Sequence, residues 1–478
     1  MTDEQSRYAR VPVPEVTGEE RLKSFELIYG PYSLEDAVLE GQRCLECALP
    51  FCVEACPITQ DCRGYNILVA QRRFDDAAKV VLRENPLAST LCKVCYHYCE
   101  DACIMAERGV PIAIRQLKRA ALDYGRSDLA YVPSAPRNQR IAVVGAGPAG
   151  LMAAWELGLR GYSVTVFEEE PYIGGQVGTI PKFHMDGREI LDDVGRFRNL
   201  DVTFALGQRA GVDFAPEALL KAGYRAVYLA LGTSYHNVLG IPGEELPGVY
   251  YAFDLLRALN KGPPVQLGRR IVVIGGGDVA MDAVRSALRL AAPGGSVQLV
   301  YRKSRASMPA GAEELEEADA ERVTYLFERS PKAILGVDRV QGVVFQRTQL
   351  SPPGPGGVRS IVPVPDSEET LACDTVIAAV GERADLSGLA PDLGLKSRAH
   401  AWPEGTNPDT MTGIEGVFAS GGKSVVYAMA AGTRSAEAIE AYLAKKDGRS
   451  PIPRPDPFAE GRPPAPPKGY TGPTWRLG

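Results

Sequence analysis

The sequence predicts a multidomain fold: an N-terminal all-α domain, then two α/β Rossmann-like dinucleotide-binding domains, the second inserted in the first. Three observations lead to this prediction. The chain has 478 residues, which is too long for one ordinary hydrophobic core. Nine of its ten cysteines lie between Cys44 and Cys103, and a glycine-rich motif at residues 140–150 recurs at 270–280. One cysteine-rich unit and two nucleotide-binding units therefore account for most of the chain.

The bulk composition is that of a globular protein, with 45% hydrophobic and 23% charged residues. The net charge of −6 gives no reason to expect a nucleic-acid partner. The most apolar window, residues 141–159, contains four glycines, a proline and Glu156, so it predicts a strand, a tight turn and a helix instead of a membrane span. The first ten residues lack the apolar core of a secretion signal. We therefore expect a cytoplasmic protein with no membrane span.

Residues 1–135 are predicted to form the all-α domain. Apolar residues recur with helical spacing in SLEDAVLEGQRCLEC and IRQLKRAALDYG, and the cysteines lie at turns between such stretches. Seven cysteines form two spaced groups, which are Cys44, Cys47, Cys52 and Cys56, and Cys95, Cys99 and Cys103. Because cytosolic thiols are kept reduced, this crowding indicates metal binding more than disulfide bonds.

The spacing within the two groups is typical of iron–sulfur ligands. The first group ends in Cys56-Pro57 and departs from the bacterial ferredoxin run only by two extra residues before its third cysteine. In that run the cysteine before proline ligates the other cluster, so the first cluster needs a ligand from the second group. The second group has one cysteine in about every helical turn, so all three can face one region. Seven thiolates therefore serve two clusters that need eight ligands.

The alternative is one or two structural zinc sites, because closely spaced cysteines also form tetrahedral thiolate cages and His97 lies nearby. Zinc has no reason to accompany two dinucleotide folds, whereas iron–sulfur clusters accept the single electrons that a flavin releases. Cys62 and Cys92 lie outside the spacing pattern and are interpreted as inert core residues, although either could complete the second cluster. Cys373 is expected to be plain core.

Two strand-like segments suggest how the α/β units are connected. YRAVYLALG and TVIAAVG flank the second glycine motif, which indicates that the second unit is inserted into the first and that the chain then returns. The proline-rich C-terminal stretch cannot sustain a helix or a central strand, so we expect a tail that lies on the surface or on a partner. We place the first dinucleotide-binding domain at 136–245 and 371–447, the second at 246–370, and the tail at 448–478.

The first glycine motif predicts an FAD site. Its glycines permit a tight turn, the close approach of a pyrophosphate, and the packing of helix on strand. Glu168 lies 23 residues past Gly145, at the end of the next strand, where it can accept hydrogen bonds from a ribose hydroxyl and would repel a 2′-phosphate. The segment Gly174-Gly175-Gln176 supplies a second close backbone approach. The predicted FAD contacts are Gly145, Gly147, Ala149, Gly150, Glu168, Gly175 and Gln176.

The second glycine motif predicts an NADPH site. Its turn contains Gly275, Gly277, Asp278 and Ala280, and the following strand ends without an acidic residue. Arg302 and Lys303 stand there instead, and a cation at this position suits a 2′-phosphate, so NADPH is favoured over NADH. The alternative is that these two cations are merely solvated. Hydride transfer needs no protein acid or base, so no catalytic side chain is assigned.

Together these motifs resemble the small subunit of NADPH-dependent glutamate synthase and the matching N-terminal half of dihydropyrimidine dehydrogenase. The resemblance extends to about Leu443 and rests on RCLECALPFCVEACP, ENPLAS before VCYHYCEDAC, VVGAGPAGL, YIGGQ before IPKF, LALGTSYHNVLGIPGEELPGV, VVIGGGDVAMDAVRSALR and VYRKSRASMPA. It implies an adrenodoxin reductase-like arrangement, with Gly232 and Gly421 also at the FAD. It further implies two [4Fe-4S] clusters, one held by Cys44, Cys47, Cys52 and Cys103 and the other by Cys56, Cys95 and Cys99.

The sequence departs from that family at three places. The eighth cluster ligand, a Glu or Gln in the family, aligns with Lys118, and a protonated amine cannot bind iron. Gln116, Cys92 and Cys62 are the candidates to replace it, unless the alignment is shifted. The late flavin motif has Gly421-Gly422-Lys423 where the family carries an Asp after its glycine, and the tail after Gly448 has no counterpart.

The resemblance implies an electron-input module, in which a hydride passes from NADPH to FAD and single electrons pass through the clusters to a partner. The leading hypothesis is a glutamate synthase small subunit within a hetero-oligomer. The alternatives are an NAD(P)H reductase subunit of another complex, acting in pyrimidine reduction or on ferredoxin, and a non-catalytic scaffold that has lost FAD.

Overall fold

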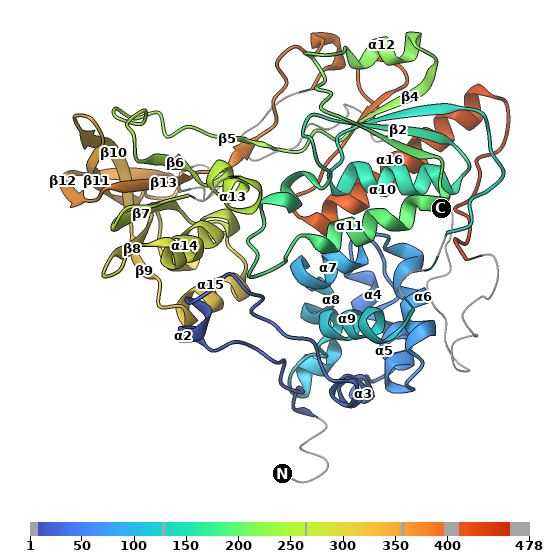
Figure 1. Ribbon diagram of the computed structural model, residues 1–478, viewed down its shortest axis with the longest axis horizontal. Helices are drawn as coiled ribbons and strands as arrows, with labels where there is room; N and C mark the ends of the chain where they lie inside the picture. The colour runs from blue at the N-terminus through green and yellow to red at the C-terminus, as the bar shows by residue number, and fades with distance from the viewer. Residues whose placement is uncertain are drawn as a thin grey trace.

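The computed structural model describes residues 8–126, 129, 131–262, 265–354, 359–395 and 411–458. Three units are visible in Figure 1: a helical unit at the bottom, an α/β unit above it on the right, and a second α/β unit on the left. The predicted fold class is confirmed, because an all-α N-terminal part precedes two α/β units with parallel five-stranded sheets.

The helical unit consists of short helices around a shared apolar core. Its helices are α2 (Gly18–Arg21), α3 (Leu34–Gln42), α4 (Phe51–Glu54), α5 (Cys62–Ala70), α6 (Phe74–Glu84), α7 (Ala88–Val94), α8 (Tyr98–Asp101) and α9 (Ile114–Tyr124). Side-chain caps start two of them: Ser33 accepts the Asp36 N–H before α3, and Asp61 accepts the Gly64 N–H before α5. The predicted cluster cysteines lie in or beside the shortest helices and their connecting loops, where the backbone turns often enough to bring several thiols together.

The first α/β unit has the strand order β15-β4-β1-β2-β3, with all strands parallel. The strands are β1 (Arg140–Val144), β2 (Ser163–Glu168), β3 (Val202–Leu206), β4 (Tyr224–Leu229) and β15 (Val417–Ala419). Helices α10 (Pro148–Leu159) and α16 (Val425–Lys446) pack closely together beside this sheet (Figure 1). A Cβ atom at Gly432 of α16 would lie 2.2 Å from the Ala149 carbonyl oxygen, so only glycine permits this approach. Short helices α11 (Arg188–Gly195) and α12 (Pro216–Lys221) connect the strands.

The second α/β unit has the strand order β6-β13-β7-β8-β9. Its strands are β6 (Val249–Tyr251), β7 (Arg270–Gly275), β8 (Ser296–Tyr301), β9 (Thr324–Phe327) and β13 (Thr375–Ala379), and its helices are α13 (Ala252–Lys261), α14 (Asp278–Leu290) and α15 (Ala312–Ala320). An antiparallel sheet extends it, built from β10 (Arg329–Gly336), β11 (Val340–Leu350) and β12 (Ile361–Ala372). Strand β15 returns to pair with β4 of the first unit, which makes the second unit an insertion.

We expected the chain to return from the second α/β unit to the first at residue 371. This boundary lies too early in the sequence. Strand β13, which contains the TVIAA run, lies between β6 and β7 in the second sheet and not in the first. The return comes only after β14 (Glu382–Arg383), which pairs with β5 (Tyr235–His236) where the chain passes between the units. A buried parallel strand is apolar on both faces, so its composition does not reveal which sheet it joins.

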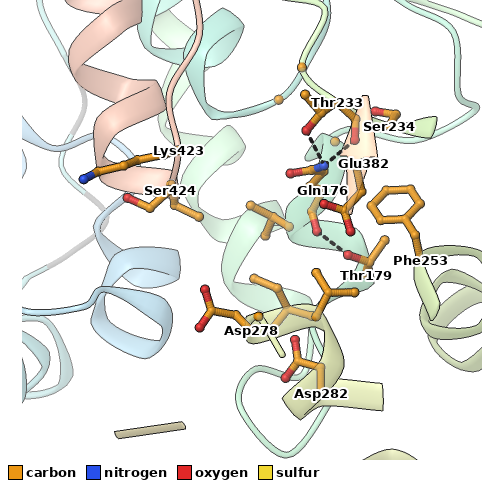
Figure 2. Close-up of a pocket in the computed structure, with 18 of the residues that line it drawn as sticks. Gln176, Thr179, Thr233, Ser234, Phe253, Asp278, Asp282, Glu382, Lys423 and Ser424 are labelled. Carbon is orange, nitrogen blue, oxygen red and sulfur yellow. Dashed lines mark hydrogen bonds between the residues drawn. The ribbon is translucent and has the colours of Figure 1, made fainter. Parts of the chain in front are cut away.

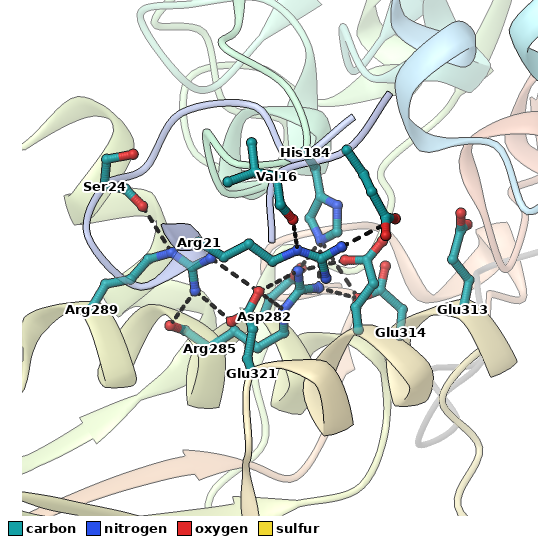
Figure 3. A network of polar contacts seen from close by, with 12 residues as sticks. Val16, Arg21, Ser24, His184, Asp282, Arg285, Arg289, Glu313, Glu314 and Glu321 are labelled. Carbon is teal, nitrogen blue, oxygen red and sulfur yellow. Dashed lines mark hydrogen bonds and ion pairs between the residues drawn. The ribbon is translucent and has the colours of Figure 1, made fainter. Parts of the chain in front are cut away.

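A segment near the N-terminus, residues 14–30, packs across all three units. It folds back on itself through the Val16 N–H, which donates to the Ile28 carbonyl at 2.9 Å, and Ile28 donates in turn to the carbonyl of Phe183 in the first α/β unit at 3.0 Å. Arg289 of α14 donates to the Ser24 carbonyl at 3.0 Å (Figure 3). The segment therefore fastens the second α/β unit to the rest of the molecule.

The described part of the tail, residues 448–458, contains no helix or strand and packs on the first α/β unit. Arg454 donates to Glu156 at 2.8 Å, and the Phe458 ring lies 5.5 Å from that of Tyr131. The remainder of the predicted tail lies outside the described residues. No helix in the described segments combines the length and apolar character that a membrane crossing requires.

Candidate functional site

One cavity of about 840 Å³ runs between the three units. Both glycine turns line it, and so do Cys92 and Cys95 of the helical unit. The structure thus brings together, around one space, the two dinucleotide motifs that are about 130 residues apart in the chain and one member of the second cysteine group.

The first glycine turn has the geometry that the sequence predicts. Gly145 has φ of +110°, and a Cβ atom there would lie 2.3 Å from the Ala230 carbonyl oxygen. A Cβ at Gly150 would lie 1.9 Å from the Gly145 oxygen, whereas one at Gly147 would meet nothing closer than 3.9 Å. Gly147 and Ala149 both line the cavity. The turn can therefore admit a pyrophosphate beside Gly147, at the N-terminus of α10.

Glu168 is fixed at the end of β2 beside this turn. Its carboxylate accepts the Ala146 N–H at 2.6 Å and the Glu170 N–H at 2.9 Å. The side chain is buried, and this burial raises the pKa of Glu168 above its usual range. A carboxylate held at the cavity wall in this way is suited to accept hydrogen bonds from ribose hydroxyls.

Two further loops, one with Gly175 and Gln176 and the other with Gly232 and Thr233, lie beside the first glycine turn. A Cβ at Gly175 would lie 3.0 Å from the Gly147 Cα, so the two predicted glycine segments touch. The Gln176 amide donates to the Thr233 carbonyl at 2.6 Å and to its hydroxyl at 3.0 Å (Figure 2), which ties the segment to the loop that contains Gly232. Gly232 has φ of +64° and lines the cavity.

The late flavin motif lies on the α16 side of the cavity. Gly421, Gly422 and Lys423 all line it, and Figure 2 shows Lys423 and Ser424 across the space from Gln176 and Thr233. A Cβ at Gly422 would lie 2.2 Å from the Ala428 nitrogen, so this glycine packs on the first turn of α16. The N-terminus of this 22-residue helix therefore borders the cavity. Backbone N–H groups there can contact an anionic or carbonyl group of a flavin.

The second glycine turn repeats the geometry of the first. A Cβ at Gly275 would lie 2.3 Å from the Ala379 oxygen, one at Gly277 would meet nothing closer than 3.9 Å, and Ala280 is buried. Asp278 begins α14 and accepts the Gly311 N–H at 2.8 Å. The site can therefore admit a second pyrophosphate beside Gly277.

Of the basic residues that follow β8, only some line the cavity. Arg302 is exposed and lines the cavity, and within the described chain its guanidinium has no hydrogen-bond or ion-pair partner. Lys303 does not line the cavity, and Arg305 is paired with Asp319. Arg329 of β10 also lines the cavity and donates to the Phe327 carbonyl at 2.7 Å. Sequence reasoning missed Arg329, because it belongs to the antiparallel extension, which no motif marks.

Acidic side chains gather where the two dinucleotide sites meet. Figure 2 shows Asp278 and Asp282 of α14 below Glu382 and Gln176. Burial raises the pKa of Glu382 to about 7 and that of Asp282 to about 6. Asp282 lies 3.2 Å from His184, whose pKa rises to about 10 despite burial, because Glu314 and Asp282 stabilise its charged form (Figure 3). Sequence reasoning named Asp278 as part of the second glycine motif, but it missed Asp282, His184 and Glu382.

Four cysteines of the helical unit line a separate small cavity. They are Cys44, Cys47, Cys52 and Cys103, the set that the resemblance implies for one cluster. Buried Arg63 and Asn66 line the same cavity, and Arg63 donates to the Cys47 carbonyl. No three cysteine sulfurs of the described chain lie within 4.8 Å of one another, whereas thiolates around one zinc ion lie about 3.8 Å apart. The all-thiolate donor set, without such a compact trio of sulfurs in the described chain, fits an iron–sulfur cluster better than a zinc ion.

The remaining predicted ligands surround a buried lysine. Charge interactions connect Lys118 to Cys56, Cys95, Cys99 and Cys92, and its side chain is only 5% exposed. Cys62 is 1% exposed, and its thiol interacts electrostatically with those of Cys56 and Cys99. Cys62 is therefore a neighbour of two predicted ligands. Cys373 lies in an apolar cluster of the second α/β unit, as expected.

Comparison with known proteins supports the division into units. Residues 21–129 match a family model described as dihydropyrimidine dehydrogenase domain II with a 4Fe-4S cluster, and residues 139–438 match the pyridine nucleotide-disulphide oxidoreductase family. Among solved structures, FprA from Mycobacterium tuberculosis in complex with NADPH has a TM-score of 0.55 at 21% identity, covering 66% of this chain and 88% of its own. This similarity is evidence for the fold and not for a shared activity.

Curated relatives include subunits of different enzymes. The beta subunit of NADP(+)-dependent formate dehydrogenase from Moorella thermoacetica is 36% identical over 430 residues, which are 82% of this chain and 60% of the relative. The small chain of NADPH glutamate synthase from Halomonas elongata is 34% identical over 451 residues, which are 88% and 94% of the two chains. The fold and these matches support an iron–sulfur centre, FAD and NADPH as cofactors. The chain belongs to the pyridine nucleotide-disulphide oxidoreductase family, and within it to the NADPH oxidoreductases with an N-terminal 4Fe-4S domain that include the glutamate synthase small chains.

Proposed function

We propose that this chain is the electron-input subunit of a larger cytoplasmic enzyme of the glutamate synthase type, with two [4Fe-4S] clusters. The observation that carries the proposal is the single cavity that both glycine turns and Cys95 line. FAD supplies the step from a two-electron hydride to single electrons when it is bound there. The residues of the chain bind the two nucleotides against each other and keep the second cysteine group beside them.

The positions of the two cysteine groups suggest an order of transfer. Cys95, of the second group, borders the large cavity. The separate small cavity is lined by Cys44, Cys47, Cys52 and Cys103, and none of these four borders the large one. Leu49 and Phe51 lie beside that separate group and are 66% and 44% exposed. We infer that electrons pass from the flavin region to the second cluster, then to the first, and leave near these two side chains.

A tagged chain expressed in its own host should co-purify with an acceptor subunit, and identification of that subunit tests the proposal. Recovery of a large glutamate synthase subunit, together with NADPH-dependent formation of glutamate, would support it. Recovery of a different catalytic subunit would support a reductase role in another complex. A chain that lacks flavin absorbance and iron would refute electron input altogether and favour a scaffold.

A further inference from the structure

We infer that Arg329, at the start of β10, is a second cation for the 2′-phosphate of the nucleotide, beside Arg302, and that Glu369 neutralises Arg329 when no phosphate is bound. The inference deepens the proposed function and rests on it, because it presupposes that NADPH is the electron donor. It adds a specificity-determining residue from the antiparallel extension, which lies outside the glycine motif.

The 2′-phosphate needs more positive charge than one arginine supplies. A phosphate monoester carries more than one negative charge at neutral pH and offers three acceptor oxygens. Arg302 follows directly after β8, where a dinucleotide fold places the residue that contacts the ribose 2′ position. Of its basic neighbours, Lys303 does not line the cavity and Arg305 is paired with Asp319. A second cation must therefore come from another part of the fold.

The backbone holds Arg329 close to Arg302. The Glu328 N–H donates to the Lys303 carbonyl at 3.2 Å, and the Thr348 hydroxyl donates to the Arg302 carbonyl at 2.8 Å. Thr348 also donates its N–H to the Glu328 carbonyl at 2.8 Å. These bonds tie the end of β8 to the start of β10, and both arginines line the same cavity.

A strained residue brings Arg329 to this place. Glu328 separates β9 from β10 and has φ of +60°, a conformation that is unfavourable for a residue with a side chain. Such a conformation persists only where the surrounding structure holds it, and the two backbone hydrogen bonds of Glu328 do so here. The strain is therefore linked to the position of the next side chain, that of Arg329.

The Arg329 guanidinium is only partly used by the protein. Its Nη1 donates to the Phe327 carbonyl at 2.7 Å and its Nε pairs with Glu369 of β12, whereas Nη2 has no hydrogen-bond partner among the described residues. The side chains of Arg329 and Glu369 are 26% and 44% exposed. Because so exposed an ion pair is weak, a phosphate with more than one charge can compete for the arginine.

A third arginine increases the excess of positive charge. Arg347 of β11 lies directly opposite Arg329 in the antiparallel ladder, and like charges in such a pair repel each other. Within the described ranges, Glu369 is the one acidic side chain that pairs with either of them. Arg347 does not line the cavity, so we do not propose it as a phosphate contact. A phosphate bound to Arg329 would reduce this repulsion.

The test measures binding of 2′,5′-ADP and of 5′-AMP, which differ only in the 2′-phosphate, by calorimetry on the full-length protein with its cofactors. We expect Arg329→Gln to weaken binding of 2′,5′-ADP about tenfold and binding of AMP less than about twofold. Lys332→Gln is the matched control, because Lys332 lies on the same strand, pairs with Glu368 of β12 and does not line the cavity. It should leave both affinities unchanged. Unchanged binding of 2′,5′-ADP in Arg329→Gln, or equal losses for both ligands, would overturn the inference.

The part assigned to Glu369 has its own test. Glu369→Gln removes the competing carboxylate, so it should strengthen binding of 2′,5′-ADP and leave binding of AMP unchanged. Glu368→Gln, which removes the neighbouring carboxylate on β12, is the control. Weaker binding of 2′,5′-ADP in Glu369→Gln would overturn the neutralising role.

Two further measurements apply if Arg329→Gln does not fold, which its melting temperature and iron content would show. Arg329→Lys keeps the charge but not the planar fork, so it should retain part of the preference for 2′,5′-ADP. Phosphorus NMR of 2′,5′-ADP bound to Arg302→Ala should still show a 2′-phosphate pKa below that of the free ligand, because Arg329 remains. A pKa equal to that of the free ligand would exclude a second cation at the phosphate.

The wild-type protein separates this inference from the proposed function. If it binds AMP as tightly as 2′,5′-ADP, NADPH is not the preferred donor and the proposed function itself is contradicted. If it prefers 2′,5′-ADP and Arg329→Gln keeps the full preference, only the assignment of Arg329 is overturned.

Discussion

Arg115 of α9 forms an ion pair with Glu313 of α15, with an Nη1 to Oε2 distance of 2.8 Å. The helical unit is therefore bound directly to the second α/β unit, called the NADPH unit below because we propose the NADPH site there. The same guanidinium donates to the Cys95 carbonyl at 3.1 Å. Gly311 of the NADPH unit packs on the Tyr96 ring, and the Tyr98 ring lies 5.4 Å from Tyr427 of α16. The loop that holds two predicted cluster ligands therefore touches both dinucleotide units.

Replacing Glu313 by glutamine should loosen this contact. Burial opposes the charge of Glu313, but His97 and Arg115 outweigh it and hold the pKa of this carboxyl well below its usual range. Its stabilising effect is therefore fully present above about pH 4.5 and is lost only in strong acid. Because Glu313 is partly exposed, we expect a loss of about 1–2 kcal/mol at pH 7, seen as a lower melting temperature. The exposed Glu316→Gln on the same helix is the control; equal melting temperatures for both variants would contradict the prediction.

His184 should make the attachment of the NADPH unit sensitive to high pH. Its pKa is raised to about 10 in the folded protein, so its stabilising effect is complete below about pH 6.5 and is lost as the pH rises through 10. Melting temperatures from pH 7 to pH 10.5 should fall more steeply for the wild type than for His184→Gln. His236→Gln, at an ion pair elsewhere, should keep the wild-type slope. Parallel curves for all three proteins would exclude this role.

Arg302→Ala should weaken NADPH binding selectively. The side chain lines the cavity without a protein partner in the described residues, so a nucleotide 2′-phosphate can pair with it. Loss of a charge-assisted contact costs about 1.5–3 kcal/mol, which corresponds to a rise of about one to two decades in the KM for NADPH. The KM for NADH should change little. Arg305→Ala is the control, because Arg305 is already paired with Asp319. Equal effects of Arg302→Ala on both nucleotides would indicate a structural residue.

Cys47→Ser should remove the first cluster and destabilise the helical unit, because metal–ligand bonds contribute to its folding. Iron and sulfide should fall by up to half, and the melting temperature should drop. Cys373→Ser changes a core cysteine of the NADPH unit and should leave the iron content unchanged. Full iron in Cys47→Ser would remove Cys47 from the ligand set.

Lys118→Met should lower the midpoint potential of the second cluster. A buried cation favours the more negative reduced state, so its removal makes reduction harder. Redox titration followed by electron paramagnetic resonance measures the change for each cluster. Lys93→Met, which removes the cation 3.9 Å from Glu189 at the cavity wall, should have a smaller effect. An unchanged midpoint in Lys118→Met would show that the lysine is remote from the iron.

The sequence predicts best those features that depend on the local backbone, such as the two glycine turns. The turns at Gly145 and Gly275 need positive φ and close approach of backbone atoms, and these demands are readable from the motif alone. Arg329 and Glu382 reach the cavity only because the units pack as they do, and no local pattern records that packing. The assignment of β13 failed for a related reason, since an apolar strand does not specify its neighbours.

The position of residues 14–30 has a consequence for how the protein is made. The contacts of this segment include Phe183, Arg289 and the carbonyl of Ala320, which a Cβ at Gly18 would approach to 2.4 Å. At roughly 5–20 residues per second, the ribosome completes these surfaces about 15–60 s after the segment emerges. This segment is thus synthesised well before its partner surfaces and is among the last to reach its final position.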